Sequence, residues 1–167
     1  MPHISERGAA LPASPIRKLT PYAEAAKARG VKVYHLNIGQ PDLPTPEKAM
    51  EAIRSIDKRT LSYSMSQGTP VLREEFSKYY RTFGIDLDPD EIIVTAGGSE
   101  ALLATFLTCF DPGDEVIITE PGYANYLSFA EAAGLVVKAV TSKIENGFAL
   151  PSAEDFKKAI TPRTKAI

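Results

Sequence analysis

Apolar residues in the first half of the chain recur mostly at helical spacing. The pattern predicts three helices, which are expected at residues 21–30, 46–56 and 70–84. A threonine-proline pair opens each one, as expected if the threonine caps the helix and the proline occupies its first turn. Between the first two helices, residues 31–46 are expected to form a short strand that runs into a proline-rich loop. The third helix is expected to carry one apolar face, made of Leu72, Phe76, Tyr80 and Phe83.

From residue 92 the pattern changes to short apolar runs that alternate with helical segments. The apolar runs predict strands at 92–96, 114–120 and 135–140, and the start of a further strand at 163–167. The segments between them predict helices at 99–110, 124–134 and 152–160, the last opened by a capping box of Ser152 and Asp155. Short apolar strands joined by helices are typical of a parallel sheet covered on both faces, so we expect an α/β fold.

The composition and net charge of the chain limit the kinds of molecule that it can be expected to bind. Nineteen basic and 21 acidic residues give a net charge of −2, which provides no basic surface for nucleic acid or an anionic membrane. No apolar stretch approaches the roughly 18 residues that cross a bilayer. Cys109 is the single cysteine, so an internal disulfide is excluded, and we expect its side chain to pack in the core. Together with the two histidines, His3 and His35, it provides too few ligands for a zinc site. We therefore expect a cytoplasmic protein that acts on small molecules and holds no metal.

Gly97, Gly98 and Ser99 lie where a predicted strand gives way to a helix. The first turn of a helix has unpaired N–H groups and partial positive charge, which attract anions. Two glycines let the backbone approach a ligand closely, and the serine hydroxyl can donate to a phosphate oxygen. The same residues could form only a tight turn with a serine cap, and the stretch by itself leaves both interpretations open. It matches neither a P-loop nor a dinucleotide-binding fingerprint.

Three other loops contain candidate ligand contacts. A Pro-Gly turn follows the strand ending at Glu120 and brings Tyr123 to the edge where open α/β sheets bind ligands. Tyr123 could stack on a planar ring or pack on the next helix. Gly39 would let a bare amide reach a carboxylate, or it forms a plain turn. Tyr63 lies in a stretch that by itself is ordinary loop sequence.

Taken in order, these stretches resemble a known family: NIGQPDLPTP, YSMSQGTPVLREEF, VTAGGSEAL and DPGDEVIITEPGYANY. They are similar to the N-terminal part of the fold-type I pyridoxal phosphate enzymes, specifically the class I and II aminotransferases related to aspartate aminotransferase. The similarity runs from about residue 14 to the end of the chain. Each motif is weak evidence by itself, but four of them in the family's order and spacing are specific.

The resemblance implies a division of the fold. Residues 1–45 would form an N-terminal arm and small-domain segment, and residues 46–167 an incomplete three-layer αβα large domain that binds the cofactor. In the family's large-domain sheet, the strand before the phosphate site and the next two strands lie toward opposite edges, with later strands between them. Those later strands would have to come from beyond residue 167.

The resemblance also implies roles for single residues. Gly98, Ser99 and Glu100 match the cup that holds the 5'-phosphate of pyridoxal phosphate, and Tyr123 matches the aromatic residue that stacks on the pyridine ring. Gly39 matches the glycine whose backbone contacts the substrate's α-carboxylate.

A homodimer is implied as well. Tyr63 matches a tyrosine that reaches the cofactor phosphate of the neighbouring subunit. The substrates implied by the family are an amino acid and a 2-oxo acid. The sequence does not identify which amino acid is used.

The lysine that bonds to the cofactor lies, in this family, well beyond residue 167. We therefore expect no catalytic residue in this segment and no transaminase activity from it alone. We also expect it to be part of a longer polypeptide or to depend on another chain. Lyases and synthases of the same fold share these motifs, so the reaction class stays open. A different reading also stays open, that of a non-catalytic binding or assembly module such as part of a regulator.

Overall fold

The computed structural model describes residues 3–11, 14 and 16–167. It divides into two units, which are described separately: Met1–Val33 with Ala96–Ile167, and Tyr34–Thr95. The division into residues 1–45 and 46–167 that the family resemblance implies stays a prediction.

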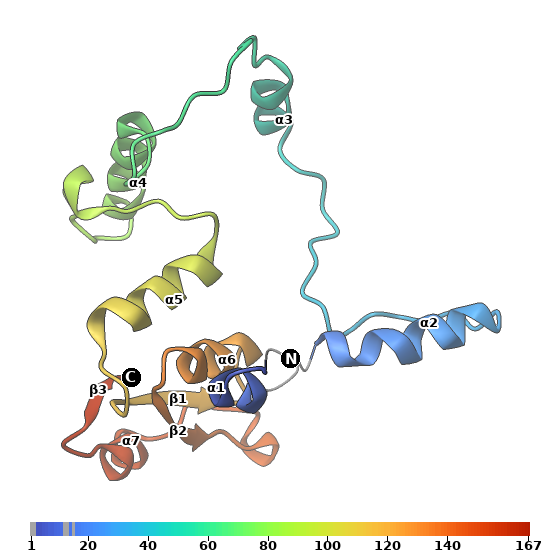
Figure 1. The fold of residues 1–167 in the computed structure, drawn as a ribbon, viewed down its shortest axis with the longest axis vertical. Helices are drawn as coiled ribbons and strands as arrows, with labels where there is room; N and C mark the ends of the chain where they lie inside the picture. The colour runs from blue at the N-terminus through green and yellow to red at the C-terminus, as the bar shows by residue number, and fades with distance from the viewer. Residues whose placement is uncertain (1–2, 12–13, 15) are drawn as a thin grey trace. The chain divides into compact units, whose positions relative to one another are not determined.

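The first unit contains a three-stranded parallel sheet in the order β2-β1-β3 (Figure 1). Its strands are β1 (Glu115–Glu120), β2 (Val136–Thr141) and β3 (Thr164–Ala166). β1 and β2 pair along their whole length, whereas β3 pairs only with Glu115 and Val116. Most of one edge of β1 therefore has no strand beside it in the described part of the chain. The α/β class and the strands predicted at 114–120 and 135–140 are confirmed.

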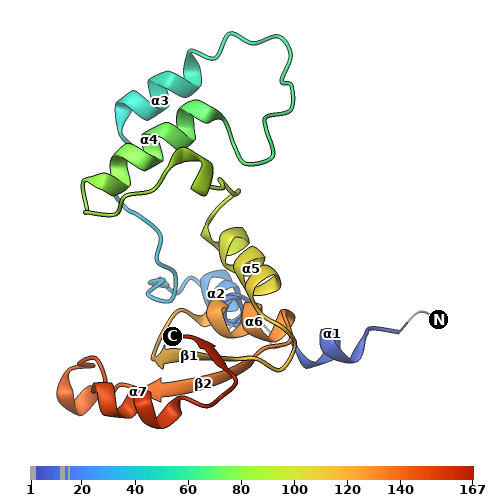
Figure 2. The ribbon, with the colours of Figure 1, turned by 90° about the vertical axis from the view of Figure 1, so that its left-hand side faces the viewer.

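Helices cover the sheet on both sides. α5 (Gly98–Cys109) and α6 (Ala124–Ala132) lie on one side, and α7 (Ala153–Ala159) lies on the other (Figure 2). The core forms between the first two helices and the sheet, and its fully buried cluster comprises Phe106, Val116, Ala130, Ala133 and Leu135. Burial of these apolar side chains is the main stabilising contribution to this unit.

The remaining short elements of the first unit are α1 (Glu6–Ala10), η1 (Arg17–Leu19), α2 (Thr20–Ala28) and η3 (Ile144–Asn146). The second unit contains α3 (Glu47–Arg54), α4 (Pro70–Arg81) and the short 3-10 helix η2 (Pro89–Glu91).

α4 is attached to the following loop by buried polar side chains. Arg73 donates from Nη1 to the Pro89 carbonyl oxygen at 2.7 Å and to Asp90 Oδ1 at 2.9 Å. Ser77 Oγ donates to the Leu87 carbonyl oxygen at 2.6 Å. Because backbone carbonyls carry most of this contact, the loop is held largely independently of its side chains.

The predicted apolar face of α4 is therefore wrong in part. Leu72 and Phe83 are 42% and 64% exposed, and the buried positions of the helix are Arg73 and Ser77. The helix turns toward the loop that its polar groups bind. Cys109, predicted to pack in the core, is also exposed. Phe106 and Phe110 pack edge to face with ring centroids 5.6 Å apart, and the last helical residue lies outside that contact.

The predicted threonine caps are found only in part. Thr69 occupies the N-cap position of α4 but makes no side-chain cap hydrogen bond. α2 begins at Thr20 itself, because η1 runs directly into it and the preceding Leu19 is already helical. The N-cap position of α3 is Pro46, not Thr45.

Two predicted strands are absent from the described residues. Residues 92–96 form no strand, and neither does any part of residues 31–46. Val94 donates its N–H to the Gln67 carbonyl oxygen at 2.9 Å, which is a loop contact. A strand needs a neighbouring strand to satisfy its backbone groups, and an apolar run alone does not supply one.

Candidate functional site

The turn before α5 is closed by its own backbone. Gly97 is the N-cap residue, and its carbonyl oxygen accepts from the N–H groups of Glu100 at 3.1 Å and Ala101 at 3.2 Å. The Glu100 carboxylate folds back and accepts from the Ala96 N–H at 2.6 Å. These bonds span at most four residues, so the turn is determined locally.

The same turn leaves donors pointing outward from the helix end. The N–H groups of Gly98 and Ser99 and the Ser99 hydroxyl make no hydrogen bond within the described part of the chain, and both residues are exposed. A Cβ atom added at Gly97 or Gly98 would meet nothing within 4 Å, so the space beside both glycines is open. Residues 96–101 are called the phosphate-type turn, because two amides, a hydroxyl and the positive end of a 12-residue helix suit a phosphate group.

Tyr123 lies at the start of α6. β1 ends at Glu120, and a short turn leads to Tyr123, which is the N-cap residue of the helix. A Cβ atom at Gly122 would lie 2.5 Å from the Thr119 carbonyl oxygen, so this close turn requires glycine. The Tyr123 side chain is about half exposed, and its ring meets that of Tyr126 edge to face with centroids 5.4 Å apart.

The two helices connect to opposite ends of β1. α6 begins directly after β1 ends, and α5 runs back to the point from which β1 starts (Figure 1). The two helices also pack together in the core through Phe106 and Ala130. Tyr123 therefore lies at the carboxyl end of β1, the side at which open α/β sheets bind ligands. An apolar hollow of about 460 Å³ adjoins Tyr123 there, lined in part by Leu127 and Val137.

Gly39 and Tyr63 lie in the second unit, in segments without helix or strand. Gly39 is exposed and has nothing within 4 Å of an added Cβ atom, and the Tyr63 side chain is fully exposed. Their roles at the substrate carboxylate and at a neighbouring subunit stay predictions.

One charged residue was not singled out by the sequence pattern. Glu115 opens β1 and is fully buried, with Oε2 accepting from Thr161 Oγ1 at 2.7 Å and Oε1 accepting from Arg163 Nη2 at 3.0 Å. The Thr161 hydroxyl, the nearby Lys138 ammonium and the Arg163 guanidinium hold the pKa of the Glu115 carboxyl below its ordinary value, against the opposing effect of burial. Glu115 lies at the amino end of β1, so it fastens the segment leading into β3 and does not face the candidate site.

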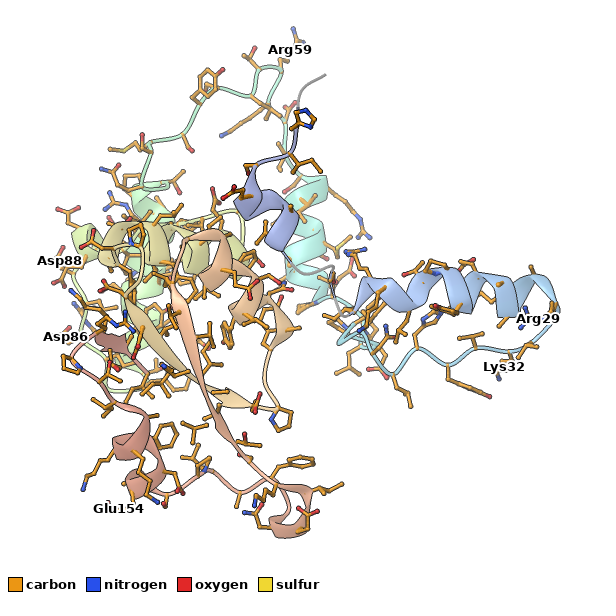
Figure 3. All side chains as sticks on the ribbon, turned by 60° about the horizontal axis from the view of Figure 1, so that its bottom comes forward. Arg29, Lys32, Arg59, Asp86, Asp88 and Glu154 are labelled. Atoms are coloured by element: carbon orange, nitrogen blue, oxygen red, sulfur yellow. The ribbon has the colours of Figure 1, made fainter. Side chains whose placement is uncertain are left out.

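The charged side chains do not gather into a metal site in the described ranges, where no cluster of three or more potential ligands occurs. Figure 3 shows exposed charged side chains pointing away from the ribbon at Arg29, Lys32, Arg59, Asp86, Asp88 and Glu154. Among the described helices, none is both long and apolar enough to cross a bilayer.

Comparisons with known proteins identify the family of the chain. Residues 31–167 match the family described as aminotransferase class I and II. The chain is 38% identical over 166 residues to the aspartate/prephenate aminotransferase of Thermus thermophilus, covering 98% of this chain and 43% of that protein. It is 37% identical to the aspartate aminotransferase of Geobacillus stearothermophilus, again over 98% of this chain and 42% of the relative.

Solved structures give the same result. The crystal structure of Thermotoga maritima aspartate aminotransferase matches with a TM-score of 0.87 and 34% identity, over 97% of this chain and 44% of that one. An alanine aminotransferase from Pyrococcus furiosus matches with a TM-score of 0.89 and 33% identity, over 98% and 42%. The chain thus spans less than half the length of these relatives. With a family match that covers residues 31–167 and the same fold in each neighbour, the chain belongs to the class I and II aminotransferase family.

Proposed function

We propose that this chain is the N-terminal part of a cytoplasmic, homodimeric aminotransferase. The enzyme moves an amino group between an amino acid and a 2-oxo acid, with pyridoxal 5'-phosphate as its cofactor. The observation that carries the proposal is the turn at Gly98 and Ser99, whose amides and hydroxyl are exposed at a helix start. The printed names of the relatives, which are aspartate, aspartate/prephenate and alanine aminotransferases, support the reaction class.

The turn fits the phosphate of this cofactor. The Gly98 and Ser99 amides and the Ser99 hydroxyl donate to phosphate oxygens, and the helix dipole favours the negative charge there. Glu100 supports the turn indirectly, because its carboxylate and its N–H are already engaged with Ala96 and Gly97. Its carboxylate is thereby turned onto the backbone.

Tyr123 holds the other end of the cofactor. Its half-exposed ring offers one face for stacking on a planar heterocycle. When bound, the cofactor supplies an electron-accepting ring, and the protein contributes orientation and electrostatics. The backbone of Gly39 contacts the substrate carboxylate, and Tyr63 reaches the phosphate in the partner subunit.

The segment alone is proposed to be inactive. Its part is to hold phosphate, ring and substrate carboxylate, while the lysine that bonds to the cofactor belongs to the remainder of the enzyme. A purified 167-residue chain that converts a 2-oxo acid at the expense of an amino acid would refute this point.

The test is a titration of pyridoxal 5'-phosphate into the full-length protein. A visible absorbance band that borohydride removes is expected, and a non-catalytic binding module would not give one. Ser99→Ala removes one hydrogen bond to a charged group, so the Kd should rise roughly tenfold to a hundredfold. Thr105→Ala is the matched control, because Thr105 lies exposed in the same helix and its hydroxyl donates to the Ala101 carbonyl oxygen. Equal affinities of both variants and the parent protein would refute the phosphate site.

A further inference from the structure

The ring of Tyr123 is held at its tip as well as at its base. At the base, the tight turn at Gly122 and the start of α6 determine where the side chain leaves the backbone. At the tip, Asn125 Nδ2 donates a hydrogen bond of 2.7 Å to Tyr123 Oη. The edge-to-face contact with Tyr126, at 87° between ring planes, restricts the ring from the side.

The helix makes this contact possible. Asn125 is the second residue of α6, and Tyr123 is its N-cap, so the amide lies on the first turn beside the ring that precedes it. The backbone of the same turn is closed by the Tyr126 N–H, which donates to the Tyr123 carbonyl oxygen at 3.0 Å. Asn125 is therefore carried by a rigid element and not by a loop.

The direction of the bond has a consequence for the phenol. Because the amide nitrogen donates, the phenol oxygen accepts, and its own hydrogen remains available to another group. The bond thus fixes the ring without using the phenol's donor. Tyr123 is 49% exposed, so the residue is accessible to a ligand.

We propose that Asn125 is a positioning residue for pyridoxal phosphate binding, which acts by fixing the ring of Tyr123. The inference rests on the proposed function, in which Tyr123 stacks on the cofactor. Asn125 itself touches no part of the cofactor in this account. Its effect on cofactor binding depends entirely on the hydrogen bond that it donates to the phenol oxygen.

A double-mutant cycle on the full-length protein tests whether Asn125 acts through the phenol oxygen of Tyr123. Asn125→Ala should weaken binding of pyridoxal 5'-phosphate by about threefold to tenfold, the range expected for one neutral hydrogen bond. Tyr123→Phe removes the acceptor, so adding Asn125→Ala to it should change the Kd no further. Ser128→Ala, in the same helix, is the control and should bind as the parent does. If Asn125→Ala weakens binding equally with and without the phenol, Asn125 acts through the helix and the proposal is overturned.

A second measurement needs no cofactor. Fluorine NMR of the cofactor-free full-length protein labelled with 3-fluorotyrosine reports its tyrosines, seven of which lie in residues 1–167, and the Tyr123 signal is assigned by its loss in Tyr123→Phe. Asn125→Ala should shift or broaden that signal, and Ser128→Ala should not. An unchanged Tyr123 signal in Asn125→Ala would overturn the proposal. If the parent protein fails to bind pyridoxal 5'-phosphate, the proposed function fails, and this spectrum still decides whether Asn125 orders the ring.

Discussion

Replacement of Gly122 by alanine tests how closely the end of β1 determines the position of Tyr123. The new Cβ atom would lie 2.5 Å from the Thr119 carbonyl oxygen, whereas such contacts are essentially never shorter than 3.0 Å. The two atoms must therefore separate by at least 3.0 − 2.5 = 0.5 Å. Thr119 pairs with Val140 in the sheet, so the turn is expected to move and the strand to stay.

This displacement should affect both stability and binding. Forcing one extra carbon into a tight site costs about 1–3 kcal/mol of unfolding free energy. Tyr123 follows Gly122 directly, so its ring should also move away from the cofactor. A lost aromatic contact of about 0.5–1.5 kcal/mol corresponds to a Kd for pyridoxal 5'-phosphate that is roughly twofold to twelvefold higher.

Urea denaturation followed by far-UV circular dichroism measures the first effect, with the midpoint compared at constant m value. Gly39→Ala is the control for loss of glycine, because nothing lies within 4 Å of its added Cβ atom. The reasoning would be refuted if Gly122→Ala and Gly39→Ala unfolded at the same urea concentration.

Two further substitutions test the packing in each unit. In the second unit, Gly68→Ala places a Cβ atom 2.7 Å from Val94 Cβ at a φ of +98°, whereas Gly84→Ala meets open space at a φ of +75°. Gly68→Ala should therefore have an unfolding free energy about 1–3 kcal/mol lower than that of Gly84→Ala in urea denaturation. Equal unfolding free energies would show that the backbone conformation, and not the contact with Val94, determines the loss of stability. In the first unit, the lowered pKa of Glu115 stabilises the fold above the ordinary value of 4.5, and this contribution should be lost as the pH falls through the folded-state pKa. Thr161→Val removes the largest cause of the shift, so urea midpoints between neutral and acid pH should depend less on pH, and an unchanged pH profile would contradict the assignment.

The sequence predicted elements that are determined by nearby residues. The capping box at the start of α7 is present, with Ser152 Oγ accepting from the Asp155 N–H and the Asp155 carboxylate accepting from the Ser152 N–H. β1 and β2 were found because they join through one helix and pair with each other. Residues 92–96 have the same apolar character, but pairing depends on a partner that local sequence does not specify.

The features of the candidate site divide in the same way, into those that nearby residues determine and those that depend on distant contacts. The glycines and serine before the predicted helix indicated a tight turn at residues 96–101, and its form could be anticipated because the hydrogen bonds that shape it lie within those residues. Glu115 gave no comparable signal, since its partner Thr161 is 46 residues away. Asn125 lies only two residues from Tyr123, yet nothing in the pattern shows that its amide reaches the phenol oxygen.

Under the proposed function, cofactor binding and catalysis depend on different groups. The phosphate-type turn is held by the Ala96–Glu100 bond and the Tyr123 ring by the Asn125 amide, and neither contact needs a residue outside the first unit. In that proposal, covalent attachment and proton transfer belong to a lysine elsewhere in the enzyme, because the amides, hydroxyl and aromatic ring described here would hold the cofactor without bonding covalently to it. A variant such as Ser99→Ala should thus raise the Kd for pyridoxal 5'-phosphate and leave the rate of the loaded, saturated enzyme nearly unchanged. A fall in kcat at saturating cofactor would show instead that the turn also sets the position of the reacting ring.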